Sequence, residues 1–177
     1  MIQVRYAKSA MENEEGMNHL WIQMAPPGPV QNARLQLLLP PGLHRSHNLS
    51  GVDEDSSGVI SIGNALTVTD VFIEIFTLEP IPCGDHTIQV ELSYTGADGT
   101  VTHVKQETLL KVVSEEESAE IRTDDEVVRR IKALQGVGSS NSELRQYNEY
   151  TPAKLIRLDS SQVSEWEKKY RVEGATR

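Results

Sequence analysis

The strongest constraint on the fold of this chain is an alternation of apolar and polar residues between Asp85 and Val112. A turn with the sequence Gly-Ala-Asp-Gly at 96–99 divides this stretch into two β-rich runs. Because side chains alternate between the two faces of a strand, the pattern predicts a long antiparallel hairpin with one face toward solvent. The apolar positions of its first strand are Ile88, Val90, Leu92 and Tyr94.

Shorter β-rich runs precede the hairpin, and residues that favour turns separate them. Pro and Gly are concentrated at 26–29 and 40–42, where a central strand cannot continue. The stretches at 12–16 and 44–57 are polar, so we expect a turn and an irregular connection there. The whole pattern predicts an all-β fold, a single immunoglobulin-like antiparallel β-sandwich over residues 1–113. The expected strands before the hairpin are Ile2–Tyr6, Met17–Met24, Ala33–Leu39, Val59–Ile62 and Leu66–Leu78.

The character of the sequence changes after Val113, and we expect residues 114–177 to form an acidic hinge and a partly helical C-terminal extension. Thr123 and Glu126 have the spacing of a capping box, which favours the start of a helix at that point. Gly136 is expected to end this helix. Its apolar stripe consists of Val127, Val128, Ile131 and Leu134.

A second helix is expected near the end of the chain, because Asp159 and Gln162 also have capping-box spacing. Its apolar residues would share one face, which is a candidate partner-binding site since Trp and Tyr contribute strongly to protein interfaces. Packing of this face against the chain's own sandwich is the alternative. The candidate partner-binding residues of the whole extension are Val163, Trp166, Tyr170, Val127 and Ile131.

The charge of the chain argues against nucleic acid and membranes as main partners. The net charge is −9, and residues 1–113 carry 13 acidic and 6 basic side chains. Such a surface repels phosphate backbones and anionic lipid headgroups. The first residues do not resemble a signal peptide, and no apolar run approaches the roughly 20 residues that span a bilayer. Cys83 is the one cysteine, so no intrachain disulfide can form. We expect a cytoplasmic location, although a secreted fragment trimmed of its leader would look the same.

The segment from Ala33 to Leu43, Ala-Arg-Leu-Gln-Leu-Leu-Leu-Pro-Pro-Gly-Leu, resembles a strand and its end in bacterial immunoglobulin-like modules. Such modules occur in surface-protein repeats and beside von Willebrand A-type domains. The segment from Pro82 to Val90 resembles the turn that enters their penultimate strand, with His86 where an aromatic residue is common. The resemblance covers residues 1–113 and implies a β-sandwich with a role in adhesion or assembly.

Two patterns have the residue types of metal sites, but each is incomplete. Residues 53–58, Asp-Glu-Asp-Ser-Ser-Gly, match the first half of a calcium loop, yet Asn64 stands where the bidentate glutamate belongs. Two other pairs have the spacing of zinc ligands without a matching second pair in an obvious hairpin. These pairs are Cys83 with His86, and His44 with His47. We therefore expect no metal and no cofactor.

No residue pattern indicates a reaction. The chain has no Gly-x-Ser-x-Gly elbow, no papain-like cysteine context and no glycine-rich phosphate loop followed by lysine. We therefore expect no catalytic residues and a non-enzymatic protein-binding or assembly module. It would be a subunit or adaptor of a larger complex, with the extension on a protein partner or on another copy. One alternative is a lectin-type ligand- or metal-binding domain that uses the loop His44–Asp55. The other is an accessory domain for an enzyme on another chain.

Overall fold

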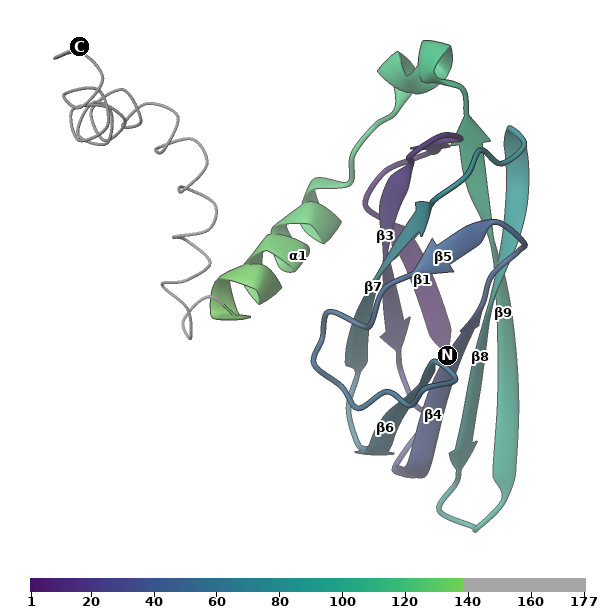
Figure 1. Cartoon of the computed structure of the whole chain (residues 1–177). Coiled ribbons are helices and arrows are strands. Elements are labelled where there is room, and N and C mark those ends of the chain that lie inside the picture. The colour runs from purple at the N-terminus through teal and green to yellow at the C-terminus, as the bar shows by residue number, and fades with distance from the viewer. Residues whose placement is uncertain (139–177) are drawn as a thin grey trace, which may run out of the picture. The chain divides into compact units, whose positions relative to one another are not determined.

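The computed structural model describes residues 1–138, which form a pair of β-sheets that face each other (Figure 1). One sheet has four strands in the order β1-β3-β7-β5, and the other has five in the order β2-β9-β8-β4-β6. This arrangement confirms the expected all-β class. The strands are β1 (Ile2–Tyr6), β2 (Met11–Glu12), β3 (Met17–Met24), β4 (Val30–Leu38), β5 (Leu43–Arg45), β6 (Val59–Ala65), β7 (Thr69–Thr77), β8 (Gly84–Thr95) and β9 (Val101–Val113).

The hairpin predicted from the alternating sequence is formed by β8 and β9. The two strands pair antiparallel in one continuous register, from Gly84 opposite Val112 to Thr95 opposite Val101. Gly99 has a φ of +81°, a left-handed conformation that glycine adopts without strain, and it closes the turn between them. The alternation of apolar residues thus determines both the pairing and the face of β8 that enters the core.

The core lies between the two sheets and is built from the inward-facing residues of both. Leu20 and Ile22 of β3 are fully buried, and so are Ile88 and Val90 of β8. The two outer faces differ in character. Aromatic side chains of β3 and β7 stand on the outer face of the four-stranded sheet, whereas the outer face of the hairpin is mostly polar, with Val101 and Leu109 exposed on it. The first of these faces is where the helix α1 (Asp125–Gly138) packs.

Several strand boundaries differ from the sequence-based expectation. The turn expected at 12–16 occupies residues 13–16. Glu12 belongs instead to β2, which pairs in parallel with the end of β9, and the buried Met11 side chain enters the core there. The expected strand Leu66–Leu78 is shorter, because Leu66 and Val68 are exposed in the turn that precedes β7. The polar stretch after Gly42 also contains the short β5, which pairs with β7.

The segment that follows β9 is attached to the sandwich rather than forming the expected hinge. After a short 3₁₀ helix, η1 (Glu115–Glu120), it runs beside the chain that links β1 to β2. The Ser9 N–H donates to the carbonyl oxygen of Arg122 at 2.7 Å, and the Asp124 N–H donates to the carbonyl oxygen of Ala7 at 2.7 Å. These bonds join residues more than a hundred positions apart.

The helix α1 (Asp125–Gly138) begins one residue later than the capping box predicted. Asp124, not Thr123, is the N-cap, because its Oδ1 accepts from the backbone N–H groups of Glu126 at 3.1 Å and Val127 at 3.3 Å. Among the residues that the structure describes, no helix is long and apolar enough to cross a membrane.

Residues 1–134 form one compact unit, and residues 135–177 are grouped as a second. The domain boundary expected after residue 113 therefore lies inside the first unit. The reason is that the first turns of α1 pack on the sandwich.

Candidate interaction surfaces

An aromatic pair on the outer face of the four-stranded sheet is the packing site of α1. Trp21 of β3 and Phe72 of β7 lie opposite each other in the sheet register, and their rings stack with centroids 5.6 Å apart. The side chains of Val127 and Ile131 pack on this pair together with Ala7 and are 0% and 6% exposed. This second, smaller core fixes the helix to the sheet.

Two arginines and one aspartate complete the surroundings of Trp21. The guanidinium carbon of Arg5 lies 5.0 Å from the centroid of the Trp21 ring, and that of Arg130 lies 4.4 Å from it. The indole N–H donates to Asp70 at 2.8 Å, and the other oxygen of this carboxylate lies 3.7 Å from the Arg130 guanidinium. We call the set of Arg5, Trp21, Asp70, Phe72 and Arg130 the Trp21 clasp. It joins β1, β3 and β7 to the first turns of α1.

Arg5 also holds the beginning of the helix directly. Its guanidinium donates to Asp124 at 2.7 Å and to Glu126 at 2.7 Å. Hydrogen bonding to Arg5 is the main cause that lowers the pKa of both carboxyl groups below their usual values. The carboxylates lie at the N-terminal end of α1, where negative charge also interacts favourably with the helix dipole.

The structure places the predicted partner-binding residues in two groups. Val127 and Ile131 are not a surface for a partner, because their side chains are buried against the chain's own sheet. The sequence showed their apolar stripe correctly but not what covers it. Val163, Trp166 and Tyr170 lie outside the described residues, so their role stays a prediction. The residues that sequence reasoning missed are those of the Trp21 clasp. The available signal was a pair of aromatic residues on the solvent side of two strands.

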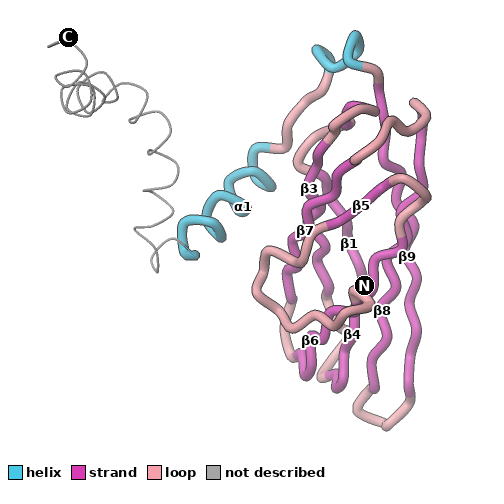
Figure 2. Tube along the Cα trace, viewed as in Figure 1, coloured by secondary structure: helices cyan, strands magenta, loops and turns pink. Residues whose placement is uncertain are grey.

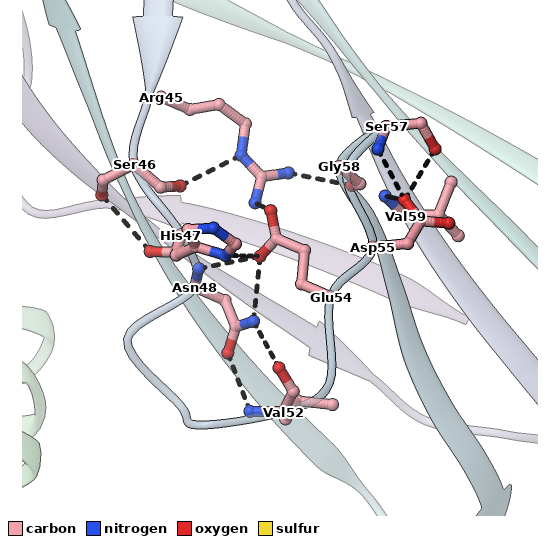
Figure 3. Close-up of polar contacts among 10 residues, drawn as sticks. All are labelled: Arg45, Ser46, His47, Asn48, Val52, Glu54, Asp55, Ser57, Gly58 and Val59. Atoms are coloured by element: carbon pink, nitrogen blue, oxygen red, sulfur yellow. Dashed lines mark hydrogen bonds and ion pairs between the residues drawn. The ribbon is translucent and has the colours of Figure 1, made fainter.

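The connection between β5 and β6, a loop in Figure 2, is held by a partly buried ion pair, which Figure 3 draws. The Glu54 side chain is only 6% exposed, and its carboxylate accepts from the guanidinium of Arg45. Its second oxygen accepts from the backbone N–H of Asn48 at 2.9 Å and from the side-chain amide at 3.0 Å. Burial alone would raise the pKa of Glu54, but the hydrogen bonds from Asn48 and the charge of Arg45 outweigh it, so the pKa is lowered.

Two of the three carboxylates of the half calcium loop, Asp55 and Glu54, have internal partners. Asp55 accepts hydrogen bonds from the backbone N–H groups of Ser57 and Val59 at 2.9 and 3.0 Å, which closes the turn before β6. Glu54 is occupied by Arg45 and Asn48. These two carboxylates therefore stabilise the backbone of the loop itself by accepting hydrogen bonds from its N–H groups.

The candidate zinc pairs are placed in other surroundings. The His86 ring nitrogen lies 2.6 Å from the carbonyl oxygen of Pro82, and Cys83 is exposed in the same turn. His44 stacks on Phe76, while His47 lies 3.6 Å from Glu54. Within residues 1–138, no group of three or more His, Cys, Asp or Glu side chains is arranged to hold a metal ion.

Comparison with known proteins shows similarity at the level of three-dimensional structure. No protein family model matches the chain, and no curated protein sequence matches it. The major pilin subunit BcpA of Bacillus cereus, in its D312A form, is 7% identical with a TM-score of 0.45, and the match covers 64% of this chain and 40% of the pilin. Domains D2 and D3 of the pilin SpaD from Corynebacterium diphtheriae are 9% identical with a TM-score of 0.48, covering 62% of this chain and 51% of that one.

A third similar structure is self-complemented MyfA, the major subunit of Myf fimbriae from Yersinia enterocolitica. It is 7% identical with a TM-score of 0.39, and the match covers 62% of this chain and 98% of that one. The chain thus spans about two fifths of BcpA and half of the SpaD fragment. Identity and TM-score are too low in all three cases to carry an argument about function. The β-sandwich in the expected resemblance is shown by the sheets themselves, whereas the particular bacterial module stays a prediction.

Proposed function

We propose that this chain is a non-enzymatic protein-binding and assembly module, in which the C-terminal extension contacts a protein partner. The observation that supports this is the Trp21 clasp. The clasp and the two backbone bonds from Ser9 and Ala7 hold the chain in a fixed position up to Leu134. Such an attachment gives a rigid body from which a following segment can reach a partner.

The extension carries the anchor residues of the proposal. Val163, Trp166 and Tyr170 recur at helical spacing in residues 139–177. A short isolated helix is marginal in water, so it needs a surface on which to fold. Large aromatic residues often dominate the binding energy of such a helix.

The experiment uses the full chain as bait in cell extract, followed by calorimetric titration of the captured protein after its purification. Trp166→Ala should weaken binding at least about 30-fold, which corresponds to about 2 kcal/mol. Lys168→Ala is the matched control, because Lys168 would lie on the opposite side of the expected helix. Its binding should stay within about 3-fold of the unmodified chain.

Equal affinity of the unmodified chain and Trp166→Ala would overturn the proposal. A large drop in melting temperature of Trp166→Ala would overturn it as well, because the aromatic face would then belong to the chain's own fold.

A further inference from the structure

The edge of β9 is open over most of its length. β8 pairs with it from Val101 to Val112, but β2 covers its other side only at Val112 and Val113. Among the strands that the structure describes, no other pairs with β9, which runs along the right-hand margin of the sandwich in Figure 1. An edge of this length presents a row of backbone donors and acceptors that can pair with another strand.

The hydrogen bonds of the hairpin show which residues of β9 point their backbone groups to this edge. The Gly96 N–H donates to the Thr100 carbonyl oxygen at 2.8 Å, so even-numbered residues of β9 bond to β8. The N–H and C=O groups of the odd-numbered residues must then point away from β8, toward the open edge. The Asn13 N–H donates to the carbonyl oxygen of Val113 at 2.8 Å on the β2 side, which agrees with this assignment. His103, Lys105 and Leu109 therefore offer their N–H and C=O groups to the open edge. Glu107 offers its N–H, while its carbonyl oxygen accepts from the Gln106 side-chain amide at 2.9 Å.

The same odd-numbered residues carry their side chains on the outer face of the sheet. The Lys105 side chain is 65% exposed and lies 2.7 Å from Glu91 of β8. Glu107 is exposed and has no partner for its side chain within residues 1–138. A cation and an unpaired anion thus stand two residues apart on one face of an unpaired edge.

We propose that this edge binds the β9 strand of a second copy of the chain, antiparallel and centred on Gln106. In this register Lys105 lies opposite Glu107 of the second copy, and Glu107 lies opposite Lys105 of the second copy. Residues directly opposite in an antiparallel pair have Cβ atoms about 5 Å apart, so both ion pairs form on the outer face. The arrangement has two-fold symmetry and joins the two five-stranded sheets into one continuous sheet.

The positions of the charges favour this register over those centred on Lys105, Glu107 or Thr108. Centring the pair on Lys105 or on Glu107 sets identical charges opposite each other. Centring it on Thr108 sets Lys105 opposite Lys111 of the second copy, twice by symmetry. Like charges directly opposite in a sheet are destabilising. In the register centred on Gln106, each Lys105 lies between its own Glu91 and Glu107 of the second copy.

This inference goes beyond the proposed function, because it uses neither the extension nor its partner, and either can fail without the other. The experiment is sedimentation velocity of the full chain over a range of concentrations at physiological ionic strength. The unmodified chain should form a concentration-dependent dimer. Lys105→Glu and Glu107→Lys should each raise the dimer dissociation constant at least about tenfold. The double variant reverses both charges and should restore it to within about threefold.

A backbone test uses the outward-facing N–H of Leu109. Leu109→Pro removes this donor without breaking a bond to β8, and proline is tolerated on edge strands. It should abolish the dimer at every concentration and leave the far-ultraviolet circular dichroism spectrum unchanged. Leu109→Ala is the matched control, because it removes the same side chain but keeps the N–H, and should dimerise like the unmodified chain.

Lys111→Glu controls for net charge. It changes the charge by the same amount as Lys105→Glu, but in the proposed register it faces the uncharged Val101 of the second copy. Its dimer should therefore be unaffected. A chain that stays monomeric at all concentrations would overturn the proposal. So would a dimer that tolerates Leu109→Pro, or one that the double charge reversal does not restore.

Discussion

The guanidinium of Arg130 covers the ring of Trp21, with 4.4 Å between its central carbon and the ring centroid. Arg130 belongs to α1 and Trp21 to β3, so their contact fastens the helix to the outer face of the four-stranded sheet. A cation over an indole face is most favourable when water is excluded, and Trp21 is 4% exposed. Asp70 holds both partners in place, through the indole N–H at 2.8 Å and the guanidinium at 3.7 Å.

Replacing Trp21 should destabilise the fold strongly. We expect Trp21→Ala to lower the free energy of unfolding by roughly 3–5 kcal/mol, as for a buried aromatic residue removed from a core. Trp21→Phe should cost less, because it keeps the stacking on Phe72 although it loses the hydrogen bond to Asp70. Urea unfolding followed by circular dichroism measures both. A change below about 1 kcal/mol in Trp21→Ala would show that α1 is not held by this ring.

Shortening the chain tests where the folded unit ends. We expect a chain of residues 1–138 to unfold cooperatively, since it keeps the Trp21 clasp. A chain of residues 1–113 should still fold, because every strand of the described residues lies within it, but with about 3 kcal/mol or more less stability. It loses the burial of Val127 and Ile131 and uncovers an aromatic patch.

Thermal and urea unfolding of the two chains side by side give the comparison. Equal stability would mean that α1 contributes nothing to the unit. A molten or insoluble 1–113 chain would mean that the helix completes the core. Residues 1–113 would then not be a unit that folds by itself.

The sandwich could be predicted well because its longest hairpin alternates regularly and the other strands are separated by turn residues. The period of two in β8 determined both its register and its buried face, and proline and glycine separated the earlier strands. Short or irregular pieces were missed for the same reason. Strand β2 has only the two residues Met11 and Glu12, too few for any period to appear. Leu66 lies in the turn before β7, but its apolar side chain continues the apolar pattern of the strand, so the sequence predicts a strand that begins too early.

The clasp was harder to predict because its contacts are not local. The stripe of Val127 and Ile131 was visible, but a stripe does not say which surface it covers. The pairing of Arg5 with Asp124 joins residues that are 119 positions apart. The backbone bonds of Ser9 and Ala7 to the segment before α1 help to bring them together. The sequence had indicated a hinge there, because acidic residues outside a regular pattern resemble a solvated linker.

Divalent metal ions should not change the stability of the folded unit. Two of the three carboxylates of the half calcium loop, Glu54 and Asp55, bind Arg45, Asn48 and the turn at 57–59. Thermal unfolding with calcium, zinc or a chelator should therefore give the same midpoint. A metal that binds only the folded chain, at 100 times its dissociation constant, would add about 2.7 kcal/mol. The midpoint would then rise by several degrees, an outcome that would contradict this prediction.

Acid should weaken the fold in part through Glu54. Its pKa in the folded chain lies below the ordinary value of 4.5, so its contribution to stability is fully present above that value. The contribution is lost as the pH falls through the lower, folded pKa.

At neutral pH we expect Glu54→Gln to cost about 3 kcal/mol, because it leaves the charge of Arg45 without its partner in a nearly buried place. The two proteins should converge in stability as the pH falls below 4.5, since a protonated glutamate and a glutamine at this position resemble each other. Glu79→Gln removes an exposed carboxylate and serves as the control, with no change expected at either pH. Urea unfolding at a series of pH values measures the difference. A cost of Glu54→Gln that stays constant with pH would show that the carboxylate charge is not what holds the loop.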